Sequence, residues 1–213
     1  MRPGKIVAVA KNYAKHALEM GGKGEKGKVS FFVKPSSSVI FQGSPILRPS
    51  ACKDLHHEVE LGVVISRRCC DASAADWQSY VGGYCLGLDM TARDLQATAK
   101  KEGQPWTLGK CWDTFTPLGP TLPSAALPDP HAVELWLKVD GMERQRGSTA
   151  DMLAKIPELI QEISAVMTLE AGDVILTGTP EGVGPVAPNQ TITAGITGVC
   201  EMSFLVQQRG CEK

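Results

Sequence analysis

Two acidic residues and an apolar run stand together in one stretch of the sequence, Leu55-His56-His57-Glu58-Val59-Glu60-Leu61-Gly62-Val63-Val64-Ile65. Because side chains alternate along a β-strand, a strand here places His56, Glu58 and Glu60 on one face. Two carboxylates side by side on one face repel each other unless a cation lies between them. An exposed edge strand with a solvated acidic face is the alternative. The apolar residues that follow favour a strand that enters the core.

Short runs rich in β-forming residues occur on both sides of this stretch, and Gly, Pro, Asp or Ser bounds many of them. The sequence predicts strands over residues 6–10, 29–33, 39–41, 59–66, 80–88, 133–139, 174–177, 191–193 and 199–206. Helical periodicity is found over residues 12–20, 91–101 and 151–167, with Pro157 near the start of the last helix. Strands outnumber helices without a regular βαβ alternation, so the predicted fold class is mixed α+β and mostly β.

A further acidic residue follows the strand predicted over residues 80–88. On a helix that begins there, Asp89, Arg93 and Gln96 lie on one face at i, i+4 and i+7. The alternative is that Asp89 is only the N-cap of that helix. Together, Glu58, Glu60 and Asp89 offer three hard oxygen ligands, which suit Mg²⁺ or Mn²⁺. A ligand role for His56 would instead favour Fe²⁺ or Zn²⁺, although such a histidine more often orients the ligands.

Three other residues are candidates for acid–base and oxyanion chemistry. His16 and Glu19 stand at i, i+3 on a short predicted helix, where the carboxylate raises the basicity of the imidazole and fixes its tautomer. An incidental surface pair is the alternative, but the glycine-rich residues 21–28 favour a mobile lid over residues 12–28. Lys110 offers a positive charge to a developing oxyanion, or is an ordinary surface lysine.

Composition limits the classes of protein that fit. The 213 residues carry 22 Lys and Arg against 23 Asp and Glu, which gives no electrostatic footprint for nucleic acid. No run approaches the roughly 18 apolar residues of a membrane span, and no targeting segment is visible. Seven cysteines without a C-x-x-C pair indicate free thiols in a reducing compartment, cytoplasmic or mitochondrial. We expect one catalytic domain over residues 1–213.

Five motifs occur in the order in which a known family carries them, namely Asn12-Tyr-Ala-Lys-His16, His57-Glu-Val-Glu-Leu-Gly62, Asp89-Met-Thr-Ala-Arg-Asp-Leu-Gln96, Trp106-Thr-Leu-Gly-Lys110 and Thr177-Gly-Thr-Pro-Glu-Gly-Val-Gly184. With them the chain resembles the fumarylacetoacetate hydrolase family from Ile6 to Val206, and most of all its short acylpyruvase and oxaloacetate decarboxylase branch. One departure is that Ala10-Lys11 stands where the family usually has Gly and then Arg or another residue. This departure bears on substrate preference rather than on metal binding.

The resemblance implies mixed β-sheets rolled around a central helix, a homodimer, and Mg²⁺ or Mn²⁺ held by Glu58, Glu60 and Asp89. It implies that His16 and Glu19 form a catalytic dyad on the lid. Around the substrate it places Lys11, Lys34, Arg93, Gln96, Lys110 and Thr179, of which Lys110 also takes part in catalysis.

The implied activity is metal-dependent C–C bond cleavage of a small 2-keto acid. Hydrolysis of an acylpyruvate, decarboxylation of oxaloacetate, or both would generate the enolate of pyruvate, whose charge a metal ion stabilises. One alternative is an isomerase or hydratase that acts on a 2-hydroxydienoate, and another is a non-catalytic metal-binding protein. The intact dyad favours hydrolysis, and the three intact acidic ligands argue against a degenerate site.

Overall fold

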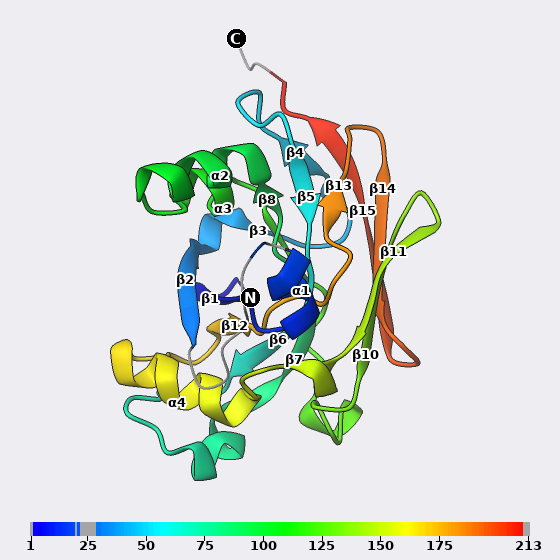
Figure 1. Ribbon diagram of the computed structural model, residues 1–213. Helices are drawn as coiled ribbons and strands as arrows, with labels where there is room; N and C mark the ends of the chain where they lie inside the picture. The colour runs from blue at the N-terminus through cyan, green and yellow to red at the C-terminus, as the bar shows by residue number, and fades with distance from the viewer. Residues whose placement is uncertain (1, 20, 22–28, 211–213) are drawn as a thin grey trace.

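Two five-stranded sheets pack against each other in the computed structural model, which describes residues 2–19, 21 and 29–210 (Figure 1). The first sheet has the order β2 (Ser30–Pro35), β1 (Lys5–Ala10), β12 (Val174–Leu176), β6 (Val59–Ile65) and β7 (Val81–Leu88). The second has the order β11 (Met142–Ser148), β10 (Glu134–Val139), β14 (Thr191–Ile196), β15 (Cys200–Gln208) and β4 (Ile46–Arg48). Both sheets mix parallel and antiparallel pairs, since β1 runs parallel to β12 and β15 parallel to β4.

Two small sheets join the large ones. One contains β13 (Gly184–Pro185), β5 (Leu55–His57) and β8 (Thr91–Ala92), and the other pairs β3 (Val39–Ile40) with β9 (Thr116–Pro117). The α-helices are α1 (Ala14–Glu19), α2 (Arg93–Glu102), α3 (Thr107–Lys110) and α4 (Ile156–Val166). Short 3₁₀ turns cover Ser36–Ser38, Ala74–Tyr80, Ser124–Ala126 and Thr149–Asp151. The predicted class, mixed α+β and mostly β, is confirmed.

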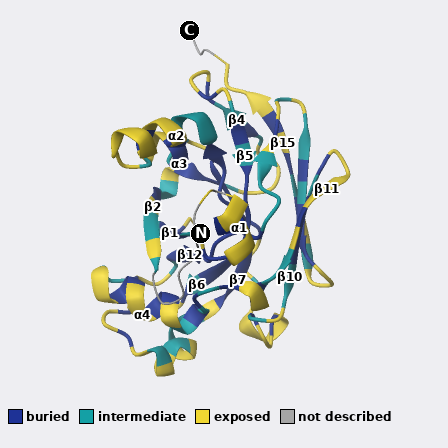
Figure 2. Cartoon of the chain, in the orientation of Figure 1, coloured by how far each residue is buried: buried dark blue, intermediate teal, exposed yellow. Residues whose placement is uncertain are grey.

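The core lies between the two large sheets, and Figure 2 shows buried residues concentrated along their strands. On the first sheet, β6 lies between β12 and β7 and is buried on both faces except at Val64, which explains its nearly continuous apolar sequence. Leu61 and Leu86 from this sheet join Leu135 and Phe204 from the second in one cluster. The six cysteines of the described chain are free thiols, as predicted.

The longest helix, α4, packs an apolar stripe into the same core. Its buried side chains include Leu159, Ile160 and Ile163, at the spacing of one helix face. Pro157 occupies the first turn, as the sequence predicts, where its missing N–H costs no hydrogen bond. The carboxylate of Glu158 accepts the N–H of Lys155 at 2.7 Å and so caps the helix start.

The prediction for the helix after β7 was wrong in one respect. The helix α2 begins at Arg93, not at Asp89, and Ala92 is its N-cap. The intervening Thr91 and Ala92 pair with β5, so Asp89 lies at the end of a strand and shares no helix face with Arg93 and Gln96. The N-cap alternative for Asp89 is also wrong. A β-branched residue followed by alanine gave no local signal for this short bridge, which depends on a distant strand.

The lid predicted over residues 12–28 is described only in part. The helix α1 covers Ala14–Glu19, whereas residues 20 and 22–28 lie outside the described residues. Asn12 anchors the start of this segment, because its Nδ2 donates to Ala154 O and Thr177 O at 2.9 and 2.8 Å. Its Oδ1 accepts the N–H of Ala154 at 2.8 Å. The side chain thereby joins the end of β1 to the residues that precede α4 and follow β12.

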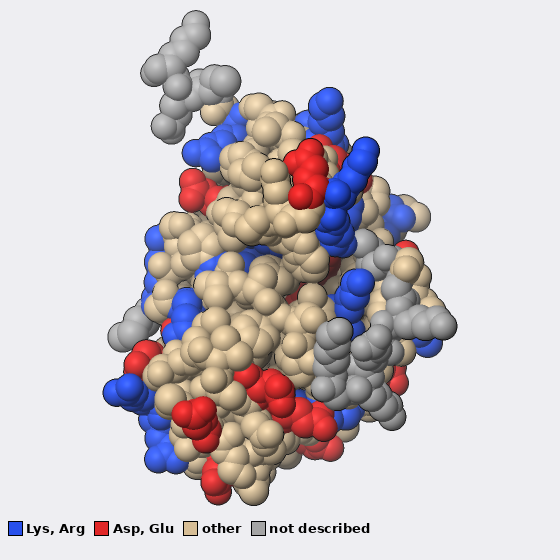
Figure 3. Space-filling model, turned by 60° about the vertical axis from the view of Figure 1, so that its left-hand side comes forward, with Lys and Arg blue, Asp and Glu red and all other residues tan. Residues whose placement is uncertain are grey.

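The surface carries charges of both signs. Figure 3 shows acidic and basic side chains interspersed over one face, in keeping with the balanced composition. Across the described residues, none of the helices combines the length and the hydropathy that a membrane crossing requires.

Candidate metal centre and active site

Three buried carboxylates meet where β6 begins and β7 ends. Glu60 lies on β6, Glu58 in the link between β5 and β6, and Asp89 directly after β7. The antiparallel register pairs Val59 with Leu88, and the N–H of Asp89 donates to Glu58 O at 2.9 Å. This pairing brings the three side chains together, and each offers an oxygen within 4.8 Å of the others. Glu58 and Glu60 come together as the alternation predicts, but Glu58 interrupts the strand, and His56, predicted on the same face, is not part of the acidic cluster.

Three basic side chains surround this acidic cluster. Lys110 Nζ donates to Glu58 Oε2 at 2.9 Å and to Asp89 Oδ2 at 2.5 Å. Arg93 pairs with the other oxygen of Glu58, and Lys34 pairs with the other oxygen of Asp89. Glu60 has a different environment, since Gly178 N–H donates to its Oε2 at 2.6 Å and no described basic group forms an ion pair with it.

Two glycines make these contacts possible. Gly178 has φ +96°, and a Cβ there would lie 2.8 Å from the Cβ of Asn12, so only glycine brings its N–H to Glu60 without displacing backbone. Gly109 precedes Lys110 in α3, and a Cβ there would lie 2.8 Å from the Cβ of Gln96. Because glycine has no Cβ, α3 approaches α2 closely enough for Lys110 to reach the carboxylates.

The pKa values of Glu58 and Glu60 are shifted in opposite directions. Burial raises the pKa of Glu58, but Lys110 and Arg93 outweigh it and hold that pKa well below its usual range. Burial, with Asp89 and Glu58 nearby, raises the pKa of Glu60 well above its usual value. Glu60 is thus a buried carboxylate with no basic partner among the described residues, beside two further buried carboxylates, and a bound cation would stabilise its charge. All three ligand atoms are oxygen, so the residues present fit Mg²⁺ or Mn²⁺.

His16 and Glu19 lie on helix α1, which follows β1, and His16 reaches the pocket beside this cluster. His16 is buried, and its Nδ1 lies 3.5 Å from Glu19 Oε2. Gly182 N–H donates to both carboxylate oxygens of Glu19, at 2.9 and 3.2 Å, which fixes that side chain toward the imidazole. Burial lowers the pKa of His16, so the ring is neutral at neutral pH and able to accept a proton.

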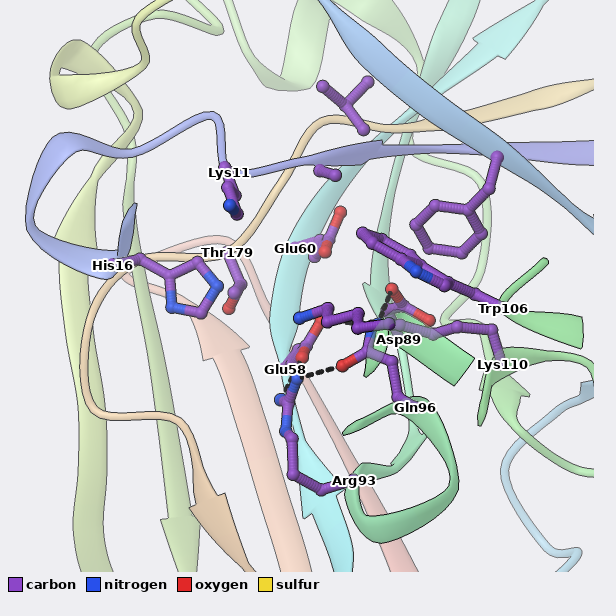
Figure 4. A pocket seen from close by; sticks show the side chains of 14 residues that line it. Lys11, His16, Glu58, Glu60, Asp89, Arg93, Gln96, Trp106, Lys110 and Thr179 are labelled. Atoms are coloured by element: carbon purple, nitrogen blue, oxygen red, sulfur yellow. Dashed lines mark hydrogen bonds and ion pairs between the residues drawn. The ribbon is translucent and has the colours of Figure 1, made fainter. Parts of the chain in front are cut away.

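One pocket unites most of the predicted site residues (Figure 4). Nine line it, namely Lys11, His16, Glu58, Glu60, Asp89, Arg93, Gln96, Lys110 and Thr179. In Figure 4, His16 and Thr179 lie on one side of the carboxylates, and Lys110 extends toward them from the other. Gln96 accepts from Arg93 Nη1 at 2.7 Å, which fixes the guanidinium against Glu58.

Two predicted site residues do not line the pocket. Glu19 lies behind His16, as a residue that orients the imidazole should. Lys34 is fully buried behind Asp89 and donates to Phe115 O at 2.8 Å, so it orients that carboxylate rather than facing the pocket. Burial lowers the pKa of Lys34 despite this partner. His56 accepts a hydrogen bond from Arg93 Nε at 3.4 Å and is not part of the acidic cluster.

The pocket also contains residues that the sequence analysis missed. Phe32 and Trp106 form one wall, with ring centroids 5.5 Å apart, and Lys100 Nζ lies 5.0 Å from the Trp106 ring centroid. The helical spacing from Arg93 through Gln96 to Lys100 could have identified Lys100, because i, i+3 and i+7 share one face. Phe32 comes from β2, on the far edge of the sheet, and no local pattern indicates its position.

The chain is similar to known proteins over most of its length. The family model for the C-terminal domain of fumarylacetoacetate (FAA) hydrolase matches residues 5–207. The mitochondrial oxaloacetate tautomerase FAHD2 of Oryza sativa subsp. japonica is 54% identical over 208 residues, covering 96% of this chain and 92% of the relative. The mitochondrial oxaloacetate decarboxylase of Dictyostelium discoideum is 50% identical over 202 residues, covering 94% and 92%.

A solved structure shares the same architecture. Fumarylpyruvate hydrolase from Pseudomonas aeruginosa, in complex with Mn²⁺ and pyruvate, superposes with a TM-score of 0.90 at 35% identity. The match covers 96% of this chain and 90% of that one. Sequence, architecture and the buried acidic cluster lead to one assignment: the chain belongs to the fumarylacetoacetate hydrolase family.

Proposed function

We propose that the chain is an enzyme that cleaves a C–C bond of a small 2-keto acid at a divalent-metal centre. The reaction is acylpyruvate hydrolysis, oxaloacetate decarboxylation, or both. One observation carries the proposal: three buried carboxylates, one of them without a basic partner in the described part of the chain, line a pocket together with a buried histidine. Relatives named as an oxaloacetate decarboxylase and a fumarylpyruvate hydrolase support the same chemistry.

Glu58, Glu60 and Asp89 are the proposed ligands of Mg²⁺ or Mn²⁺. A divalent cation there would stabilise the negative charge that develops on the substrate when the C–C bond breaks. Lys34 is proposed to hold Asp89 in place from behind, because its ammonium group also donates to Phe115 O. The structural neighbour in complex with Mn²⁺ supports this choice of metal class.

The pocket wall supplies the groups that orient a 2-keto acid. Arg93 and Gln96 form a hydrogen-bonded pair beside Glu58, and Thr179 presents a hydroxyl from the opposite side. Lys110 places a buried ammonium between Glu58 and Asp89, where burial lowers its pKa but the two carboxylates outweigh that effect and raise it. A permanent positive charge at this point stabilises an oxyanion of the substrate. Lys11 adds a further cation at the pocket mouth.

Hydrolysis additionally needs a water molecule activated next to the distal carbonyl. His16 is proposed to accept the proton of this water while Glu19 stabilises the resulting imidazolium. The hydroxide adds to the carbonyl carbon, the C–C bond breaks, and its electron pair moves into the enolate of pyruvate. Decarboxylation releases CO₂ and requires no attacking water. Helix α1, which carries both residues, is proposed to act as part of a lid.

Keto–enol tautomerisation of oxaloacetate is a second candidate, because the 54% identical relative carries that name. It requires removal of a proton from the carbon next to the keto group and its return to oxygen. The charge that develops is again that of an enolate, so the same carboxylate cluster and the same base serve it. The two candidates differ in whether a C–C bond breaks, and product analysis separates them.

Three further features are proposed. One catalytic domain over residues 1–213 and a homodimer agree with the family resemblance. Free thiols and the mitochondrial relatives support a reducing compartment. Mass in solution by light scattering tests the dimer.

The test is an assay of purified protein with Mg²⁺ or Mn²⁺ on acetylpyruvate and on oxaloacetate. We expect release of pyruvate, loss of activity with EDTA, and its recovery on re-addition of metal. Glu58→Ala is the matched loss-of-ligand variant and should be inactive. Activity that neither EDTA nor Glu58→Ala affects would refute the proposal. Enol–keto interconversion of oxaloacetate without pyruvate release would favour the second candidate.

A further inference from the structure

Gln145 connects the second sheet to the active site. It lies on β11, its side chain is 1% exposed, and it reaches the residues around β6 and the turn after β12. Its Oε1 lies 3.1 Å from Val59 N and 3.0 Å from His57 Nδ1. Its Nε2 lies 2.8 Å from Thr179 Oγ1 and 3.0 Å from Pro180 O. The buried side-chain amide of Gln145 therefore has four hydrogen-bond partners, two at its oxygen and two at its nitrogen.

Two backbone partners determine the orientation of the Gln145 side-chain amide. Val59 N–H can only donate, so the atom that faces it must be the oxygen. Pro180 O can only accept, so the atom that faces it must be the NH₂ group. A flipped amide would place donor against donor and acceptor against acceptor in a buried site, at the cost of both hydrogen bonds. The orientation thus follows from the backbone alone.

This orientation of the amide makes the Thr179 hydroxyl oxygen a hydrogen-bond acceptor toward Gln145. Nε2 of Gln145 donates to Oγ1, so Oγ1 is the acceptor in that contact. Its own hydrogen remains, and among the described residues no protein atom accepts it. Thr179 lines the pocket opposite Lys110, so the remaining hydrogen is available to an oxygen of the bound substrate.

We propose that Gln145 is a positioning residue that commits Thr179 to donate a hydrogen bond to a substrate oxygen. The inference rests on the proposed function, because it takes this pocket to be the one that holds the 2-keto acid. It assigns to Gln145 no contact with substrate. Its effect passes through Thr179, whose hydroxyl would otherwise be free to turn its hydrogen toward the protein.

The same amide also fixes His57, which gives a readout independent of activity. Oε1 accepts from His57 Nδ1, so that nitrogen carries the proton and Nε2 carries the lone pair. Nε2 is buried and without a partner in the described chain. The ¹⁵N chemical shifts of the His57 ring report this tautomer directly.

The test is a double-mutant cycle with Gln145→Glu and Thr179→Val, read as the KM for oxaloacetate with saturating Mg²⁺. Glutamate keeps the size of the side chain and the acceptor toward Val59 but cannot donate to Thr179, whose hydroxyl then turns toward the carboxylate. Each single variant should raise KM about tenfold to a hundredfold, as expected for loss of a hydrogen bond to a charged ligand. In the Thr179→Val background, Gln145→Glu should add less than about twofold.

Thermal denaturation of each variant checks that it folds, and Gln145→Leu repeats the cycle without introducing a charge. If the increases in KM of the two single variants multiply in the double variant, the proposal is overturned. A His57 ring protonated on Nε2 would also overturn it. If the wild type turns over neither substrate, the proposed function fails. The cycle is then read on pyruvate binding to the Mn²⁺-loaded protein by calorimetry, where coupled losses support the positioning role and independent losses overturn it.

Discussion

The ammonium nitrogen of Lys110 lies 2.5 Å from Oδ2 of Asp89, in the middle of the acidic cluster. This contact links α3 to the end of β7 and supplies one of the positive charges that compensate the buried carboxylates. The same oxygen belongs to a proposed metal ligand. Lys110 and a divalent cation therefore stabilise the same negative charge, and each should lessen the need for the other.

Replacement of Lys110 by methionine should destabilise the metal-free protein. Removing one partner of a buried ion pair costs about 3–5 kcal/mol, because the remaining charges lose their compensation. A bound cation replaces part of that compensation, so the loss should be clearly smaller with Mn²⁺. Thermal denaturation in EDTA and in excess Mn²⁺ measures both. An equal loss under the two conditions would contradict the shared role.

His16→Ala should separate the two cleavage reactions. Hydrolysis needs a base for the attacking water, and loss of such a base typically lowers the rate by about 10²–10⁴-fold. Decarboxylation needs no water and should fall much less. Rates of pyruvate formation from acetylpyruvate and from oxaloacetate measure the difference. Equal losses in both reactions would refute this division of roles.

The cations at the pocket mouth should determine the preference for a second carboxylate. Lys11 and Lys100 line the pocket, and no described carboxylate pairs with either. Lys11 holds a left-handed backbone conformation, φ 57°, unusual for a non-glycine residue and common near functional sites. Burial and the neighbouring Arg93 lower the pKa of Lys100. Because no described carboxylate compensates Lys11 or Lys100, the two side chains should favour a dicarboxylate such as oxaloacetate.

The measurement compares Lys11→Met and Lys100→Met on two substrates. Each should raise the KM for oxaloacetate about tenfold, the effect of losing roughly 1.4 kcal/mol of attraction. The KM for acetylpyruvate, whose distal end is a methyl group, should change little. Lys101→Met is the matched control, since Lys101 is exposed on the same helix outside the pocket. Parallel changes on both substrates would argue against this role.

His57 should make the stability of the metal-free protein depend on pH. Burial lowers its pKa from 6.5 to about 4, so between these values the unfolded state binds a proton that the folded state does not. Its contribution is complete above pH 6.5 and is lost as the pH falls through about 4, in total about 3 kcal/mol. Urea unfolding of wild type and His57→Asn from pH 7 to pH 4 measures it. If the free energy of unfolding changes with pH equally in the two proteins, the assignment to His57 is contradicted.

The sequence predicts this site well where chemistry follows local order. Glu58 and Glu60 stand two residues apart and so point the same way, and His16 and Glu19 share one turn of helix, so each pair can be recognised within a few residues of sequence. Asp89 was placed on a helix because a two-residue bridge to β5 has no local signature. Lys34 lies behind Asp89 instead of facing the pocket, and this position depends on how β2 pairs with β1.

Gln145 shows most clearly where sequence reasoning ends. It lies on an edge strand whose other side chains, such as Glu143 and Arg146, are exposed and charged, so the local pattern indicates a solvated strand. Its burial results from the packing of the second sheet against the residues around β6. Contacts of this kind join residues 34 to 88 positions apart and can be found only in the folded structure.

Metal binding most directly tests whether Glu58, Glu60 and Asp89 form a metal centre. We would titrate the metal-free protein with Mn²⁺ and follow the free ion by electron paramagnetic resonance, for wild type, Glu60→Gln and Asp89→Asn. We expect one Mn²⁺ per chain in the wild type and competition by Mg²⁺. In each variant we expect Mn²⁺ binding to weaken at least about a hundredfold, equal to roughly 2.7 kcal/mol. A wild type that binds no Mn²⁺, or variants that bind it as tightly as the wild type, would contradict this prediction.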